Sequence, residues 1–305
     1  MKLTAFLAAV ATLAAYPAHA QRVDLEELTL EARAGEPVDI TINDQPVRML
    51  IAPDAVSAVT VNGDTAERLG LEPSMFGFVY VIGSTELPFS TDTVRYRMQG
   101  GTFRRRTAYS DIQVVEGADG VVSPGHFPQE RVVLRLRDDA PGDRALTYPL
   151  VRMGRSLTGT VLEAGGVPIH VAFSFDRPET LVSATGGRII AEDRGGYFTG
   201  EAREIPVLYL VDRPVRTLTL SQPLFLGELE IRNIAVRVAD HGNADSISEE
   251  APDPDEIVVT ANTGDMPRQR MYIGMDTIGH CASITYDFDA EVLTLMCPEQ
   301  PPAGA

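Results

Sequence analysis

The feature that most constrains this chain is an internal repeat in the order of its sequence patterns. Residues 47–71 (VRMLIAPDAVSAVTVNGDTAERLGL) and 168–193 (PIHVAFSFDRPETLVSATGGRIIAED) both run from an apolar strand through a short turn to an apolar pair and a short helical segment. Each is followed by a β-rich stretch and then by a closing turn that opens a final strand, at 120–136 and 271–288. Such self-similarity indicates one structural unit built twice, so we expect two equivalent lobes.

The secondary-structure signals along the chain are those of strands. Runs of Val, Ile, Leu, Thr and Tyr are separated by Gly, Pro, Asn and Asp, whereas helical periodicity is confined to 63–71 and 184–193. The 305 residues suit two lobes of about 130–150 residues each. We therefore expect an all-β chain with few short helices and with lobes at 21–155 and 156–300.

The N-terminus is typical of an export signal. Lys2 precedes an apolar run rich in small residues that ends in AHA, so residues 1–20 are expected to be a signal peptide cleaved after Ala20. This predicts a periplasmic or secreted protein. The run is short for a membrane span, and no later stretch approaches about 20 apolar residues, so we expect no spanning helix.

The charge of the chain limits its partners. The formal net charge is −17, and phosphate binding requires clustered cations, so nucleic acid is not an expected partner. The one basic cluster, Arg104 to Arg106, is expected on an exposed strand beside acidic neighbours. A dock for an anionic ligand is the less favoured interpretation of that cluster.

The repeat resembles the retropepsin and pepsin family of aspartic proteases, with both lobes in one polypeptide. The stretches that carry the resemblance are ERLGLEP (67–73) and MYIGMDTIGHCASITYDFDAEVLTL (271–295), the second of which is similar to the family's closing Ile-Gly-x-Asp segment. In that family each lobe supplies an Asp-Thr-Gly loop, a flap hairpin and an apolar-apolar-Gly segment behind the loop. The resemblance covers roughly residues 36–298 and implies a two-lobed pepsin-like β-barrel fold with a peptide cleft between the lobes.

Both loops depart from the Asp-Thr-Gly pattern that the resemblance implies. In the first lobe its three positions are taken by Ala52, Pro53 and Asp54. In the second lobe they are taken by Asp176, Arg177 and Pro178. One acid of the family's pair is therefore expected in register, with Asp54 displaced by two positions.

These departures predict impaired catalysis. The family's chemistry needs two facing carboxylates that share a proton, and losing an acid or a base typically lowers the rate by about 10²–10⁴. Asp54 follows a proline of fixed φ, so we do not expect it to converge easily on Asp176. We also expect Arg177 to pair with Asp176 and to lower the pKa of that carboxyl.

No other catalytic or metal-binding pattern competes with this one. Asp276 lies in the closing segment, where the resemblance implies a structural role. No zinc-ligand spacing connects the scattered histidines His126, His170 and His280, so neither a metal nor a cofactor is expected.

An insert separates the last long strand of the second lobe from its closing segment. Residues 241–256 are rich in Asp, Glu, Ser and Pro, and predict a disordered, exposed loop. The following DEIVVTA (255–261) is similar to the energy-coupling box of bacterial outer-membrane receptors, which pairs with a partner's sheet edge. A strand returning to this lobe's own sheet is the favoured interpretation.

The two cysteines of the chain, Cys281 and Cys297, are expected to form a disulfide in an oxidising compartment. Residues 282–286 and 291–296 should pair as a hairpin whose turn centres on Asp289, which places the cysteines opposite one another. A four-residue turn would shift this register by one position and send the two side chains to opposite faces.

Three functions remain open at this point. The first is an exported, catalytically impaired aspartic-protease-like monomer that binds an extended peptide or protein segment in its cleft. The second is an unconventional aspartic endopeptidase that uses Asp176 with Asp54. The third is a structural protein without a ligand, which is favoured if the protein's own side chains fill the cleft.

Overall fold

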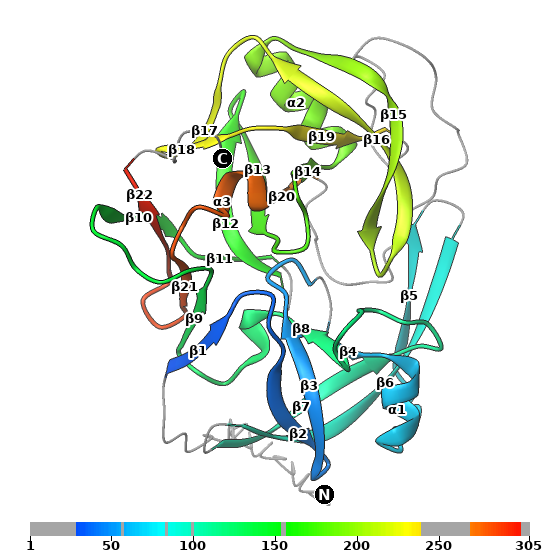
Figure 1. Ribbon diagram of the computed structural model, residues 1–305. Coiled ribbons are helices and arrows are strands. Elements are labelled where there is room, and N and C mark those ends of the chain that lie inside the picture. Colours follow the sequence, from blue (N-terminus) through cyan, green and yellow to red (C-terminus); the bar gives the residue numbers. More distant parts are fainter. Residues whose placement is uncertain are drawn as a thin grey trace, which may run out of the picture.

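The structure is a computed structural model that describes residues 29–55, 58–82, 85–98, 101–153, 157–238 and 269–299. The predicted signal peptide (1–20), the acidic insert (241–256) and the DEIVVTA segment (255–261) lie outside the described residues. Strands predominate throughout the described part of the chain (Figure 1), so the all-β prediction is confirmed.

The helices of the described residues are short. They are α1 (Gly63–Arg68), α2 (Ala184–Arg194), α3 (Met275–Ile278) and a 3₁₀ turn, η1 (Pro124–His126). None of them has the length and the apolar run that a membrane crossing would require. The two expected helices at 63–71 and 184–193 correspond to α1 and α2.

The N-terminal half of the chain forms one large sheet. Its strands are β2 (Val38–Ile42), β3 (Gln45–Ile51), β4 (Val59–Val61), β5 (Gly77–Ile82), β6 (Thr85–Met98), β7 (Gly101–Tyr109) and β8 (Gly120–Val122). They lie in the order β2-β3-β8-β4-β7-β6-β5. A further pairing between β2 and β6 closes all of these strands except β5 into a barrel.

The C-terminal half forms a second large sheet. Its strands are β11 (Val151–Met153), β12 (Leu157–Ala164), β13 (Val167–Phe173), β14 (Thr180–Val182), β15 (Gly196–Leu208), β16 (Val211–Leu220), β19 (Ile234–Arg237) and β20 (Arg270–Ile273). Their order is β11-β12-β13-β20-β14-β19-β16-β15. A separate ribbon pairs β17 (Leu224–Leu226) with β18 (Leu229–Ile231).

The two large sheets repeat the same strand order. The series β2-β3-β8-β4-β7-β6-β5 corresponds strand for strand to β12-β13-β20-β14-β19-β16-β15. In each, the third strand runs parallel to the second and antiparallel to the fourth, and the fourth runs parallel to the fifth. The sequence repeat is thus visible as a repeat of topology, whereas the predicted lobe boundary near residue 155 stays a prediction.

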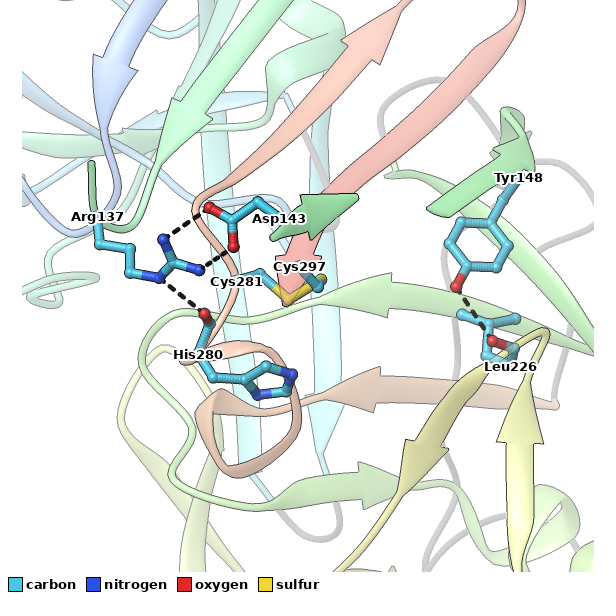
Figure 2. The surroundings of a disulfide bond; sticks show 7 residues. All are labelled: Arg137, Asp143, Tyr148, Leu226, His280, Cys281 and Cys297. Atoms are coloured by element: carbon cyan, nitrogen blue, oxygen red, sulfur yellow. Dashed lines mark hydrogen bonds and ion pairs between the residues drawn. A yellow bond between two sulfur atoms is a disulfide. The ribbon is translucent and has the colours of Figure 1, made fainter. Parts of the chain in front are cut away.

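A smaller sheet joins the two halves of the chain. Its strands are β1 (Thr29–Arg33), β9 (Arg131–Arg135), β10 (Asp143–Pro149), β21 (Ser283–Asp287) and β22 (Val292–Pro298), in the order β1-β9-β21-β22-β10. The C-terminal hairpin β21–β22 therefore lies between strands of the N-terminal half (Figure 1). Tyr148 of β10 also donates its hydroxyl to the carbonyl of Leu226 in β17 (3.1 Å; Figure 2).

Tight hairpin turns in this fold use the left-handed backbone conformation. The β2–β3 turn has Asn43 and Asp44 at φ of 49° and 64°, and the equivalent β12–β13 turn uses two glycines. These residue types tolerate positive φ. The β15–β16 turn places Tyr209 and Leu210 at φ of 47° and 61°, which is costly for large side chains.

The disulfide between Cys281 and Cys297 is present, with the two Cα atoms 4.0 Å apart (Figure 2). The predicted register is wrong by one position, because Asp287 pairs with Val292 across a four-residue turn and Ser283 pairs with Met296. The cysteines still meet because Cys281 precedes β21, where its amide donates to the Ile278 carbonyl at the end of α3 (2.9 Å). Because Cys281 lies outside the strand, the alternation of side chains along β21 does not set the direction of its side chain, and the sulfur can reach Cys297.

Replacing both cysteines with serine should lower the free energy of unfolding by about 3 kcal/mol, because the bridge closes a loop of this size in the unfolded chain. Urea unfolding of the wild type and of Cys281→Ser/Cys297→Ser measures the difference. Reduction should destabilise the wild type by a similar amount and leave the double variant unchanged. Two reactive thiols in denatured, unreduced wild-type protein would contradict the disulfide.

Candidate functional site

The two loops that the sequence singled out leave their strands at equivalent points. In the first loop the amide of Ala52 donates to the carbonyl of Val122, the last residue of β8 (2.9 Å). In the second loop the amide of Ser174 donates to the carbonyl of Ile273, the last residue of β20 (2.9 Å). Ala52 and Ser174 are therefore matching positions.

It follows that Asp54 and Asp176 also match, since each lies two residues further along its loop. The register expected from the sequence, with Asp176 in place and Asp54 displaced, is wrong. The residues equivalent to Ala52 and Pro53 are Ser174 and Phe175, and the positions after the second acid are Arg177 and Pro178. The loops differ in length by one residue before β4 and β14.

Asp54 and Asp176 line one pocket. Its other lining residues come from the β1–β2 turn and from the two loops with their strands: Gly35, Leu50, Ile51, Ala52 and Phe175. The pocket is too narrow to hold a water molecule. The fold thus brings Asp54 and Asp176 together, although they are far apart in the sequence.

Asp54 is held by two side chains of the opposite loop. The Ser174 hydroxyl donates to its Oδ2 (2.7 Å), and the Nε atom of Arg177 lies 3.7 Å from the same oxygen. The side chains of Asp54 and Arg177 are only 15% and 14% exposed, so their attraction is little screened by solvent. Ser174 was not predicted; its signal is its place two residues before Asp176.

The environment of Asp176 is different. Burial raises the pKa of its carboxyl, and the negative charge of Asp54 raises it further. Arg177 acts in the opposite direction but does not outweigh them. The expectation that Arg177 would lower the pKa of Asp176 overall is therefore wrong, because the cost of burying the charge dominates.

Arg177 connects the pocket to the β15–β16 hairpin. Its two terminal nitrogens donate to the carbonyls of Pro206 and Val207 (2.7 Å each), near the end of β15. Its guanidinium carbon lies 5.6 Å from the ring centre of Tyr272. Arg177 therefore ties the second hairpin to Asp54, and opening the hairpin there would break both hydrogen bonds.

Tyr286 of β21 is a further residue near Asp54 that the sequence did not single out. Its side chain is fully buried, and its hydroxyl has no hydrogen-bond partner among the described residues. Burial raises the pKa of this hydroxyl, and the charge of Asp54 contributes in the same direction. The joining sheet thus contributes a buried hydroxyl near Asp54.

Both long hairpins contribute to one apolar cluster beside the pocket, which we call the inter-hairpin cluster. The ring of Tyr209, at the β15–β16 turn, lies 5.7 Å from that of Tyr80 and 5.2 Å from that of Phe89 in the β5–β6 hairpin. Its buried members are Leu50, Ala52, Ile82, Leu87, Phe89, Ala108, Val114, Val115, Val121, Leu181, Val207, Val215 and Ala235. Leu50 and Ala52 also line the carboxyl pocket, so the two features are continuous.

The other candidates do not line this pocket, although the amide of Asp276 donates to the carbonyl of Pro178 in the second loop (3.1 Å). Asp276 lies in the first turn of α3, where burial raises the pKa of its carboxyl. His280 lies close to Cys281 and Cys297, with possible ligand atoms within 4.8 Å of one another. Both sulfurs belong to the disulfide, so they are not available as the thiolates that a metal ion binds.

No protein-family model matches the chain, and no curated protein matches it either. What the site can do must therefore be inferred from its geometry. A buried carboxyl with a raised pKa beside a second carboxyl is an arrangement in which one group donates a proton and the other accepts one. In this structure Ser174 and Arg177 engage the second carboxyl, and the pocket lacks room for an attacking water.

The raised pKa of Asp176 predicts a pH-dependent gain of stability in Asp176→Asn. An unfolded Asp has a pKa of about 3.9, so the folded protein loses stability as the pH rises from there through the higher folded pKa. The variant should match the wild type near about pH 3 and exceed it near about pH 7, as measured by urea unfolding. Asp289→Asn, in the exposed β21–β22 turn, is the control; a difference that does not vary with pH would contradict the prediction.

Loss of the Arg177 contacts should loosen the second hairpin. In Arg177→Gln, the amides around Val207 should exchange about 10 to 100 times faster, because two hydrogen bonds from a charged donor are lost. Hydrogen exchange followed by mass spectrometry measures this. Arg216→Gln is the matched control, since Arg216 donates to Gly200 at the other end of the same hairpin. Equal acceleration in both variants would speak against the link.

Proposed function

We propose that this chain is an exported two-lobed protein of the pepsin and retropepsin type that holds an extended, largely apolar peptide or protein segment between its two long hairpins. In this proposal it hydrolyses that segment poorly or not at all. The observation that carries the proposal is the inter-hairpin cluster, in which Tyr80, Phe89 and Tyr209 converge beside the pocket of Asp54 and Asp176.

The architecture supports the family part of the proposal. The two large sheets have the same strand order. In each, the strand that leads into the candidate loop, β3 or β13, pairs in parallel with β8 or β20. The sequence resemblance implies the same plan for an aspartic protease with both lobes in one chain. The disulfide is compatible with the oxidising compartment that an export signal implies.

The hairpins offer both elements that an extended peptide needs. Among the described residues, β5 and β15 are the last strands of their sheets, so each has one edge without a strand partner there. A peptide in strand conformation binds such an edge through its backbone, and apolar rings accept its alternate side chains. The peptide side chains would replace the ring contacts that the two hairpins now make with each other.

The surroundings of Asp54 explain why hydrolysis is expected to be poor. An aspartic protease activates a water molecule with one carboxylate while the other supplies a proton. Here the Ser174 hydroxyl donates to Oδ2 of Asp54, and the Arg177 guanidinium forms an ion pair with the same oxygen. A water molecule would have to displace these side chains and widen the pocket before it could attack a peptide bond.

An active endopeptidase is the second candidate, and one observation favours it. Asp54 and Asp176 occupy equivalent positions of two equivalent loops, and burial together with the charge of Asp54 raises the pKa of Asp176. In this candidate Asp176 is the acid and Asp54 the base. Separation of the hairpins on substrate binding would have to free Asp54 from Arg177.

Peptide binding can be tested with a clean optical signal, because the chain contains no tryptophan. A ten-residue apolar peptide with one Trp should show a saturable blue shift on titration with the mature protein. It should also slow amide exchange in β5 and β15. The same peptide with N-methylated backbone amides is the matched control and should bind much more weakly, because it cannot pair with a strand edge.

Hydrolysis is tested with the same peptide by mass spectrometry between about pH 3 and pH 7, a range that spans the upper pKa of such a dyad, about 4.7 in pepsin. Binding without cleavage supports the main proposal. Cleavage abolished by Asp54→Asn and by Asp176→Asn, but not by the control Asp276→Asn, would establish the second candidate instead. The rings of Tyr80, Phe89 and Tyr209 already meet the condition set for the third possibility, a structural protein whose own side chains fill this space. Neither binding nor cleavage would favour that possibility.

A further inference from the structure

The solvent face of the β6–β7 ladder carries four arginines. In the paired strands Arg95 lies opposite Arg104, and Arg97 and Arg106 follow at alternate positions on the same face. All four are exposed, whereas the residues between them on the strands are largely buried. The predicted exposure of the basic cluster is confirmed for Arg104 and Arg106, but Arg105 is turned inward.

These arginines are only partly neutralised. Asp44 forms ion pairs with both Arg95 and Arg97. Arg104 donates to the carbonyl of Thr93 (2.8 Å), and no carboxylate among the described residues lies within ion-pair distance of Arg104 or Arg106. Within the described part of the chain, half of the patch thus lacks the expected acidic neighbours, although the whole chain has a net charge of −17.

Two apolar side chains project beside the arginines. Met75 and Phe76, in the loop between α1 and β5, are 94% and 57% exposed. The guanidinium carbon of Arg106 lies 4.7 Å from the centre of the Phe76 ring, which places this ring at the edge of the arginine face, with the exposed Met75 next to it in the chain. Exposed large apolar side chains next to a charged surface mark an interaction site more often than isolated ones do.

We propose that this arginine face, with Met75 and Phe76, docks the protein on a membrane surface that contains anionic phospholipids. Arginines attract the phosphate headgroups, while an aromatic ring and a thioether insert at the level of the headgroups. The acidic remainder of the chain is repelled by the same surface, so the protein would bind in one orientation. A soluble acidic peptide would satisfy the arginines but would offer no apolar layer to Met75 and Phe76.

The proposal is tested by co-sedimentation of the mature chain with phosphatidylcholine vesicles, with and without about one third phosphatidylglycerol. Binding is expected only to the anionic vesicles and should weaken with added salt. Arg104→Glu/Arg106→Glu and, separately, Met75→Ser/Phe76→Ser should each lower the affinity by about tenfold or more. All of these positions are exposed, so the variants are expected to fold, which circular dichroism checks.

Matched controls come from other exposed positions. Arg33→Glu/Arg232→Glu reverses two exposed charges elsewhere, and Phe225→Ser removes another exposed ring (47% exposed); neither should change binding. Equal binding to neutral vesicles, or equal losses in the controls, would overturn the proposal. Loss only with the arginine variant, together with equally tight binding of inorganic polyphosphate or of a polyglutamate peptide, would show a general anion site and would also overturn it.

Discussion

The candidate site depends on one constraint, the parallel pairing of β3 with β8 and of β13 with β20. β8 and β20 end beside the first loop residues, Ala52 and Ser174, and accept a hydrogen bond from their amides. Asp54 and Asp176 each follow two residues after these positions. Close backbone approach is part of this constraint in the second half, since a Cβ at Gly274 would lie 2.4 Å from the carbonyl of Glu179. Two separate pairings thereby set two carboxyl groups in equivalent positions.

The fold was largely predictable because its signals are local. Apolar alternation and turn residues along the chain indicated the strands, the short helices and the repeat, and the cysteine pair was correctly joined. The loop register and the hairpin register were not predictable, because each depends on where distant strands cease to pair. The partners of Arg177 were missed for the same reason: Pro206 and Val207 lie about thirty residues away, while Asp176 is its neighbour in sequence.

Burial and charge act against each other within the carboxyl pair. Arg177 attracts negative charge, yet the pKa of Asp176 is raised, because removing its carboxylate from water costs more than the guanidinium returns. The same guanidinium faces Asp54 and bonds to the backbone of β15. Arg177 therefore influences both the charge of the pocket and the position of the second hairpin.

The β15–β16 turn has an energetic consequence for that hairpin. Left-handed backbone costs roughly 1–2 kcal/mol for each of Tyr209 and Leu210, whereas the β2–β3 and β12–β13 turns use residues that adopt it readily. The contacts of the Tyr209 ring with Tyr80 and Phe89 return about 0.5–1.5 kcal/mol each beyond their burial. The strain of the turn is present whether or not the two hairpins touch, whereas a segment that enters between them must replace both the ring contacts and the Arg177 hydrogen bonds.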